Sequence, residues 1–183
     1  MALADKKVLM VVAPTEFDGA EFEITRKVLE NRGLKVKVAS TTLGTARATT
    51  GLMVSPDVNL DDVKTWDYDA VIFVGGPGAR QLLDHEKATK LAKDCEYKVL
   101  GALGLAPGIL ANGGVLKGKR VTADTSVADL LRQKEGRFTN QPLEVDEKLV
   151  TAAGARYAEQ FGNAVLKARL LYTSDAADEE DSV

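Results

Sequence analysis

Apolar residues along the chain fall into short blocks that are separated by stretches with helical spacing. Residues 7–13, 69–74 and 99–103 are almost continuously apolar, which is typical of strands buried on both faces of a parallel sheet. Residues 34–39 alternate between apolar and polar side chains and predict a further strand. The alternation of strands and helices predicts an α/β fold with a mostly parallel, doubly wound sheet covered on both faces.

The remaining elements follow from the same patterns. Helical spacing predicts helices over residues 18–31 (with Gly33 as a C-terminal cap), 80–96, a short one ending at 111, 127–133 and 155–168. Strand patterns predict hairpins over 45–54 and 143–151 and a strand over 119–123. Nothing in the pattern indicates a repeat or a second domain, so residues 1–169 are predicted to form one domain.

The last residues differ from the rest of the chain. Residues 170–183 leave the helical pattern and form an acidic, low-complexity tail. Their sequence resembles the translation of a transposon adapter used in sequencing libraries, which predicts a non-native terminus on a gene from environmental DNA. A natural, solvated acidic tail is the alternative. Neither interpretation gives the tail a function.

Composition narrows the class of protein. An apolar content of 45% and a net charge of −3 in 183 residues predict a globular, cytoplasmic protein. The basic residues form no stripe for nucleic acid, and no apolar run is long enough to span a membrane. With one cysteine and one histidine, neither a disulfide nor a metal or other cofactor is expected. We expect Cys95 to be a packing residue and His85 to be solvated.

Candidate site residues lie after the predicted strands, where doubly wound folds bind their ligands. Gly75 and Gly76 open a Gly-Gly-Pro-Gly turn whose N–H groups are candidates for cradling an oxyanion, although such turns also occur as simple connections. Glu21 lies near the start of the first helix, where a carboxylate either caps the helix, faces water or serves a site. Asp124 follows the strand predicted over 119–123.

The strand over 99–103 runs into a sharp turn and then a helix, which is the arrangement that displays a nucleophile in α/β enzymes. Gly104 is at the tip of this turn and has no side chain. The local sequence therefore predicts a nucleophile elbow without its nucleophile.

Taken in order, four motifs resemble the ThiJ/PfpI superfamily, which includes PfpI-type intracellular proteases and the parkinsonism-associated deglycase. They are Val-Leu-Met-Val-Val-Ala at 8–13 with Glu21 following, Asp-Ala-Val-Ile-Phe-Val-Gly-Gly-Pro-Gly at 69–78, Ala-Leu-Gly-Leu-Ala-Pro at 102–107 and Gly-Val-Leu-Lys-Gly-Lys-Arg-Val-Thr at 114–122. The resemblance covers residues 6–168. It implies a flavodoxin-like three-layer sandwich of the class I glutamine amidotransferase-like type, assembled as a homodimer or as a higher oligomer built from dimers.

The resemblance also implies roles for individual residues. The family's nucleophile is a cysteine at the position of Gly104, and the carboxyl that hydrogen-bonds it matches Glu21. The oxyanion-binding backbone matches Gly76 and Leu105, the latter where the PfpI branch has a histidine. Some members place a histidine where this chain has Asp124. The resemblance therefore predicts a site that keeps its carboxyl and oxyanion hole but lacks the nucleophile and an imidazole base.

Three functional hypotheses follow. The first is a family member without thiol-dependent peptidase, glyoxalase or deglycase activity, whose small polar pocket holds water, an anion or a small carbonyl compound. The alternative is a non-covalent hydrolase or lyase that acts on small carbonyl compounds through Glu21 and Asp124 as an acid–base pair. The third is an interaction protein with a vestigial pocket. The sequence leaves open whether the protein is an enzyme, and no nucleic-acid or membrane partner is expected.

Overall fold

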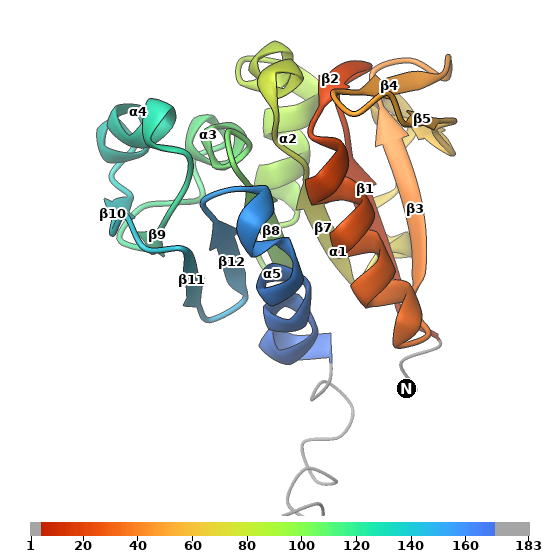
Figure 1. Ribbon diagram of the computed structural model, residues 1–183. Helices are drawn as coiled ribbons and strands as arrows, with labels where there is room; N and C mark the ends of the chain where they lie inside the picture. Colours follow the sequence, from red (N-terminus) through yellow and green to blue (C-terminus); the bar gives the residue numbers. More distant parts are fainter. Residues whose placement is uncertain (1–4, 171–183) are drawn as a thin grey trace, which may run out of the picture.

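The centre of the protein is a seven-stranded sheet, seen in the computed structural model, which describes residues 5–170 (Figure 1). The strand order is β11-β12-β8-β7-β1-β3-β6. The strands are β1 (Lys7–Val11), β3 (Lys35–Ser40), β6 (Val58–Asn59), β7 (Ala70–Phe73), β8 (Val99–Leu103), β11 (Leu143–Asp146) and β12 (Leu149–Ala152). All neighbours pair in parallel except β11 with β12. The predicted doubly wound, mostly parallel sheet is confirmed.

Helices cover both faces of this sheet and complete a three-layer sandwich (Figure 1). The α-helices are α1 (Gly19–Asn31), α2 (Glu86–Asp94), α3 (Pro107–Asn112), α4 (Ala128–Gln133) and α5 (Ala158–Val165). Short 3-10 helices are η2 (Leu60–Asp62), η3 (Thr65–Asp67), η4 (Pro77–Leu82), η5 (Thr125–Val127) and η6 (Ala155–Tyr157), and η7 (Leu166–Leu170) is a π-helical turn.

The alternation of side chains along β1 builds the two halves of the core. Val8 and Met10 point to the face covered by α1 and α5, and Leu9 and Val11 point to the face covered by α2, α3 and α4. Each of these four side chains is fully buried. Because successive residues of a strand face opposite sides, a strand buried on both faces must be apolar throughout, as this one is.

Two smaller sheets flank the central one. One contains β2 (Thr15–Phe17), β4 (Ala46–Ala48) and β5 (Met53–Val54), and the other pairs β9 (Arg120–Val121) with β10 (Arg137–Phe138). The hairpin predicted over 45–54 is present as β4 and β5. The strand predicted over 119–123 is shorter than expected and lies outside the central sheet, where it pairs with β10.

The helix predicted over 80–96 is wrong in its first half. Residues up to Leu82 form η4, and α2 begins only at Glu86. The side-chain amide of Asn112 donates a 2.6 Å hydrogen bond to the carbonyl of Leu83, so that carbonyl accepts from another element. The helix predicted over 155–168 is also divided, because η6 precedes α5 and a π-helical turn follows it. The predicted acidic tail lies, from residue 171 on, outside the described residues.

The strand order sets the position of the site. Strands β8, β7 and β1 are neighbours and run in parallel, so their carboxyl ends meet at one edge of the sheet. The loops that follow these strands carry the Gly-Gly-Pro-Gly turn, the turn at Gly104 and the segment leading to α1. The fold therefore brings three of the predicted site segments together.

Candidate functional site

A pocket of about 390 Å³ opens at the carboxyl edge of the sheet. The predicted site residues that line it are Glu21, Gly76, Gly104, Leu105 and Asp124. They come from the start of α1, from the two loops after β7 and β8, and from the segment after β9. The prediction that these separated residues share one pocket agrees with this geometry, and Gly75 adjoins the pocket through a hydrogen bond to Glu21.

Glu21 is a buried carboxyl. Its side chain belongs to the first turn of α1, and only 2% of the residue is exposed. Its Oε1 accepts a 2.7 Å hydrogen bond from the N–H of Gly75. Asp18 caps the helix instead, because its carboxylate accepts from the N–H of Glu21 at 2.8 Å. Glu21 is therefore neither the cap of α1 nor a solvated residue.

The surroundings of Glu21 favour its neutral form. Burial, together with the negative charges of Asp18 and Asp124, raises its pKa from 4.5 to about 8, and the hydrogen bond from Gly75 opposes this shift. Because Oε1 accepts from Gly75, the proton of the neutral carboxyl belongs on Oε2. At neutral pH this side chain presents an O–H donor.

Gly104 lies at the tip of the turn after β8, with a φ of +62°. Its N–H donates to the carbonyl of Ala152 at 3.0 Å, and its own carbonyl accepts from the N–H of Asp124 at 2.8 Å. A Cβ at this position would lie 2.5 Å from Oε2 of Glu21. The carboxyl of Glu21 therefore occupies part of the space that a side chain at 104 would need.

The Gly-Gly-Pro-Gly turn is required by close packing. A Cβ on Gly75 would clash with the carbonyl of Leu103 and lie 2.9 Å from the N–H nitrogen of Leu105. Gly76 has a φ of +97°, and a Cβ there would clash with the backbone nitrogen of Asp18. The two glycines let the backbones after β7, β8 and β2 approach each other, so this turn is more than a simple connection.

Two residues that line the pocket have backbone N–H groups available for a ligand. Gly76 and Leu105 both line it, and within residues 5–170 neither N–H donates a hydrogen bond to another protein atom. Backbone N–H groups that converge on one point stabilise an oxygen that carries or develops negative charge. These are the two residues for which the sequence predicts an oxyanion-binding role, and that role stays a prediction.

Sequence reasoning missed two charged residues of the pocket, which are Asp18, the N-cap of α1, and Arg80. Arg80, in η4, lines the pocket and is exposed. The only available signal was a cation shortly after the glycine turn, and that signal is common. Asp124 is also exposed and caps η5, where its carboxylate accepts from the N–H of Ser126 at 2.9 Å.

Comparison with known proteins agrees with this geometry. The sequence profile of the DJ-1/PfpI family matches residues 6–168. This chain belongs to the DJ-1/PfpI family. All the pocket residues described above lie inside the matched segment.

Individual proteins and solved structures are also similar to this chain. The uncharacterized protein MJ0967 of Methanocaldococcus jannaschii is 35% identical over 171 residues, which are 91% of this chain and 83% of that protein. The deglycase PH1704 of Pyrococcus horikoshii is 30% identical over 67% of this chain and 75% of its own. The crystal structure of a ThiJ/PfpI domain protein from Brachyspira murdochii superimposes with a TM-score of 0.86 at 30% identity, covering 88% of this chain and 95% of that one.

The single cysteine and the single histidine of this DJ-1/PfpI protein lie outside the pocket. Cys95 is buried beyond the other end of β8, and burial is the main cause that raises its pKa to about 11. His85 is at the start of α2 as predicted, but it is half-buried and therefore less solvated than expected. Among the described residues, no group of three or more His, Cys, Asp or Glu could hold a metal ion. Likewise, no helix within residues 5–170 has the length and apolarity needed to cross a membrane.

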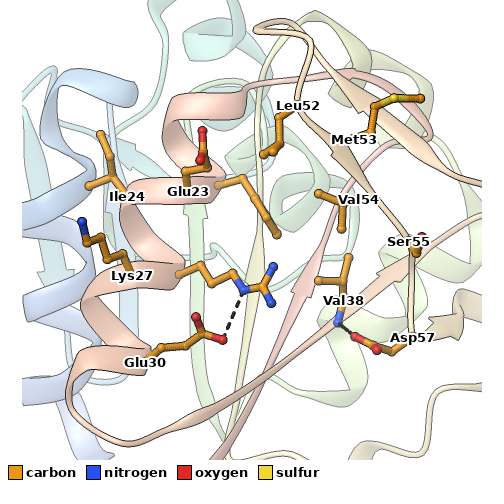
Figure 2. A pocket seen from close by; sticks show the side chains of 12 residues that line it. Glu23, Ile24, Lys27, Glu30, Val38, Leu52, Met53, Val54, Ser55 and Asp57 are labelled. Carbon is orange, nitrogen blue, oxygen red and sulfur yellow. Dashed lines mark hydrogen bonds and ion pairs between the residues drawn. The ribbon is translucent and has the colours of Figure 1, made fainter.

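A second and larger hollow lies on the other side of α1. This groove between α1 and β5 has a volume of about 700 Å³ (Figure 2). Two of its charged side chains, Arg26 and Glu30, form an ion pair at 3.2 Å. At its far side the carboxylate of Asp57 accepts from the N–H of Val38 at 2.8 Å. None of the predicted site residues lines this groove.

Proposed function

We propose that this DJ-1/PfpI protein binds a small carbonyl compound or an anion in the pocket beside Gly104 and performs no thiol-dependent peptidase, glyoxalase or deglycase reaction. The observation that carries the proposal is the position of Gly104, where Oε2 of Glu21 lies 2.5 Å from the place of a Cβ. The tip of the elbow holds a carboxyl oxygen and no sulfur.

The rest of the chain offers no replacement for the thiol. Cys95 is the single cysteine of the sequence, it is buried, and its raised pKa keeps it in the unreactive thiol form at neutral pH. In a serine protease, removal of the nucleophile alone lowers kcat by about a million-fold. We expect a comparable loss of covalent catalysis here.

The donors that remain favour a carbonyl ligand. The N–H groups of Gly76 and Leu105 and the neutral carboxyl of Glu21 are all hydrogen-bond donors at one pocket. A carbonyl oxygen or an anion accepts such bonds without a covalent step. The pocket volume lies at the small end of the range for ligand sites, which limits the ligand to a small molecule.

A second candidate function is supported by the pKa of Glu21. A carboxyl whose pKa is raised to about 8 can exchange a proton at neutral pH, and Asp124 lines the same pocket. The pair would then act as acid and base of a non-covalent hydrolase or lyase on small carbonyl compounds. A bell-shaped pH–rate profile that disappears in Glu21→Gln supports this function, and a background rate at every pH excludes it.

The test of the main proposal compares the natural chain with Gly104→Cys. The natural chain should show no turnover of methylglyoxal and no mass-spectrometric adduct in the pocket. In Gly104→Cys, we expect a thiol of lowered pKa, because the N–H donors and the O–H of Glu21 stabilise a thiolate once that carboxyl shifts aside. The rate of iodoacetamide alkylation against pH measures it, and Cys95→Ser in the same background serves as control.

Two results would contradict the proposal. One is cysteine-type turnover by the natural chain. The other is that the thiol introduced by Gly104→Cys titrates as a free cysteine, since this would show that the neighbouring donors do not form an inherited site. We also propose, from the family resemblance, that the protein is cytoplasmic and forms a homodimer or a larger assembly of dimers. Sedimentation over a dilution series measures the size of this assembly.

A further inference from the structure

We propose that the pocket beside Gly104 selects short 2-oxo acids, with the carboxylate bound by Arg80 and the oxo group bound by the N–H groups of Gly76 and Leu105. This inference rests on the proposed function, because it names the ligand class of the same pocket. It adds a charge requirement that a neutral carbonyl compound does not meet.

Arg80 is an arginine at a concave site and has no acidic partner among the residues that the structure describes. It lines the pocket, and across residues 5–170 its guanidinium makes neither an ion pair within 4.0 Å nor a side-chain hydrogen bond. By contrast, Arg26 in the larger groove pairs with Glu30. A guanidinium has donors in a planar fork that matches a carboxylate, so an unpaired one at a pocket favours a carboxylate ligand.

The acidic residues of the pocket leave Arg80 available. The carboxylate of Asp18 accepts from the N–H of Glu21, and that of Asp124 accepts from the N–H of Ser126. Glu21 itself is held in its neutral form by burial, which raises its pKa. The remaining negative charges oppose a dianion, so the site favours a ligand with a single carboxylate.

One short helix connects the two recognition elements. Gly76 is the N-cap of η4 and Arg80 lies near the end of the same helix, where the N–H of Ala79 donates to the carbonyl of Gly76 at 3.0 Å. This turn fixes the spacing between the backbone donor and the base of the arginine side chain. Leu105 supplies the second donor from the loop after β8.

The ligand class follows from these positions. A carboxylate next to a carbonyl group offers both oxygens of the carboxylate to the guanidinium and a separate oxygen to the two N–H groups. The volume of about 390 Å³ accommodates such a molecule, and the apolar side chains of Pro77, Ala153 and Ala155 line the remaining wall. A short alkyl group on the oxo carbon would lie against them.

The experiment is an NMR titration with pyruvate and with its neutral analogue pyruvamide. In the natural chain, pyruvate should bind about tenfold or more tightly than pyruvamide and should shift the amide signals of Gly76 and Leu105. Arg80→Gln should weaken pyruvate binding by about tenfold or more and leave pyruvamide unchanged. The matched control is Arg32→Gln at the C-cap of α1, which does not line the pocket and should bind pyruvate as the natural chain does.

The outcomes separate this inference from the proposed function. Equal affinities for pyruvate and pyruvamide, or unchanged pyruvate binding in Arg80→Gln, would overturn the role of Arg80 while leaving a carbonyl-binding pocket. Acetate that binds as tightly as pyruvate would overturn the requirement for the oxo group. If neither pyruvate nor pyruvamide shifts the amides of Gly76 and Leu105, both the inference and carbonyl binding in this pocket are wrong.

Discussion

Helix α1 contributes side chains both to the pocket beside Gly104 and to the groove between α1 and β5. The two hollows differ in whether the glutamate that α1 places there is buried or exposed. Glu21 is buried in the pocket and accepts from a backbone N–H, whereas Glu23, two residues further, is exposed in the groove. The groove is the larger of the two, at about 700 Å³ against 390 Å³. A buried polar group and converging backbone donors, not the size of a hollow, distinguish a site suited to chemistry.

The difference arises from the topology. The pocket lies where the carboxyl ends of neighbouring parallel strands meet, so three loops can bring backbone atoms close to one carboxyl. The groove lies between a helix surface and the small β5 strand, and Leu52, Met53 and Val54 line it on the side opposite α1 (Figure 2). Nothing in that arrangement removes water from its charged groups.

The largest loss of stability is expected from adding one methyl group to the wall of the pocket. In Gly75→Ala, the new Cβ would clash with the carbonyl of Leu103 and lie 2.9 Å from Oε1 of Glu21, so the backbone itself must move. We expect the free energy of unfolding to fall by more than about 3 kcal/mol, measured by urea denaturation. The control is Gly44→Ala, whose Cβ would meet only Thr42 at 3.7 Å, and it should change stability by less than about 0.5 kcal/mol.

Equal stability of the two alanine variants would contradict the close packing of the loops. It would mean that the backbone of the turn after β7 can move with little loss of stability. The N–H donors of the pocket would then not be held in place.

The next largest effect is on the pH dependence of stability, to which Glu21 should contribute and Glu23 should not. Because the pKa of Glu21 is raised to about 8, the folded protein keeps a proton that the unfolded chain releases between about pH 4.5 and 8. Stability from this group is therefore fully present below pH 4.5 and is lost as the pH rises through 8. Each pKa unit corresponds to about 1.4 kcal/mol, and with relaxation we expect a fall of about 2 to 3 kcal/mol.

Two variants isolate that dependence. Glu21→Gln should match the natural chain near pH 5 and be more stable near pH 8, because the amide does not ionise. Glu23→Gln should retain the full fall, since the exposed carboxylate is hydrated in both states. Urea denaturation at several pH values measures the difference, and parallel pH profiles for all three proteins would show that Glu21 ionises normally.

The sequence predicts the central fold well because β1, β7 and β8 are apolar on both faces, and such runs are visible without the structure. It misses β6, β2 and β10, which have two or three residues each and therefore no measurable periodicity. At the break between η4 and α2, the carbonyl of Leu83 accepts from the amide of Asn112, which is distant in sequence. Contacts of that kind are tertiary and have no local signal.

The candidate site, like the fold, has some features that the sequence predicts and others that it does not. Glu21, Gly104 and the glycine turn could be found because motifs in a fixed order mark them. The burial of Glu21 could not be found from the sequence, and neither could the lack of an acidic partner for Arg80 among residues 5–170. Both depend on which side chains lie nearby in space. Sequence reasoning therefore identifies the positions of the site, and the structure supplies their electrostatics.

The smallest loss of stability is expected from removing an ion pair in the groove. The ion pair between Arg26 and Glu30 is largely exposed, with 39% and 44% of the side chains accessible, and Arg26 also lies 5.6 Å from the ring of Phe22. Exposed pairs contribute little because water and salt screen them, so Arg26→Ala should lower the free energy of unfolding by less than about 1 kcal/mol. Urea denaturation in low and high salt measures this loss. A loss above about 2 kcal/mol that persists in high salt would mean that the groove, like the pocket, holds its charges away from water, and the contrast between the two hollows would fail.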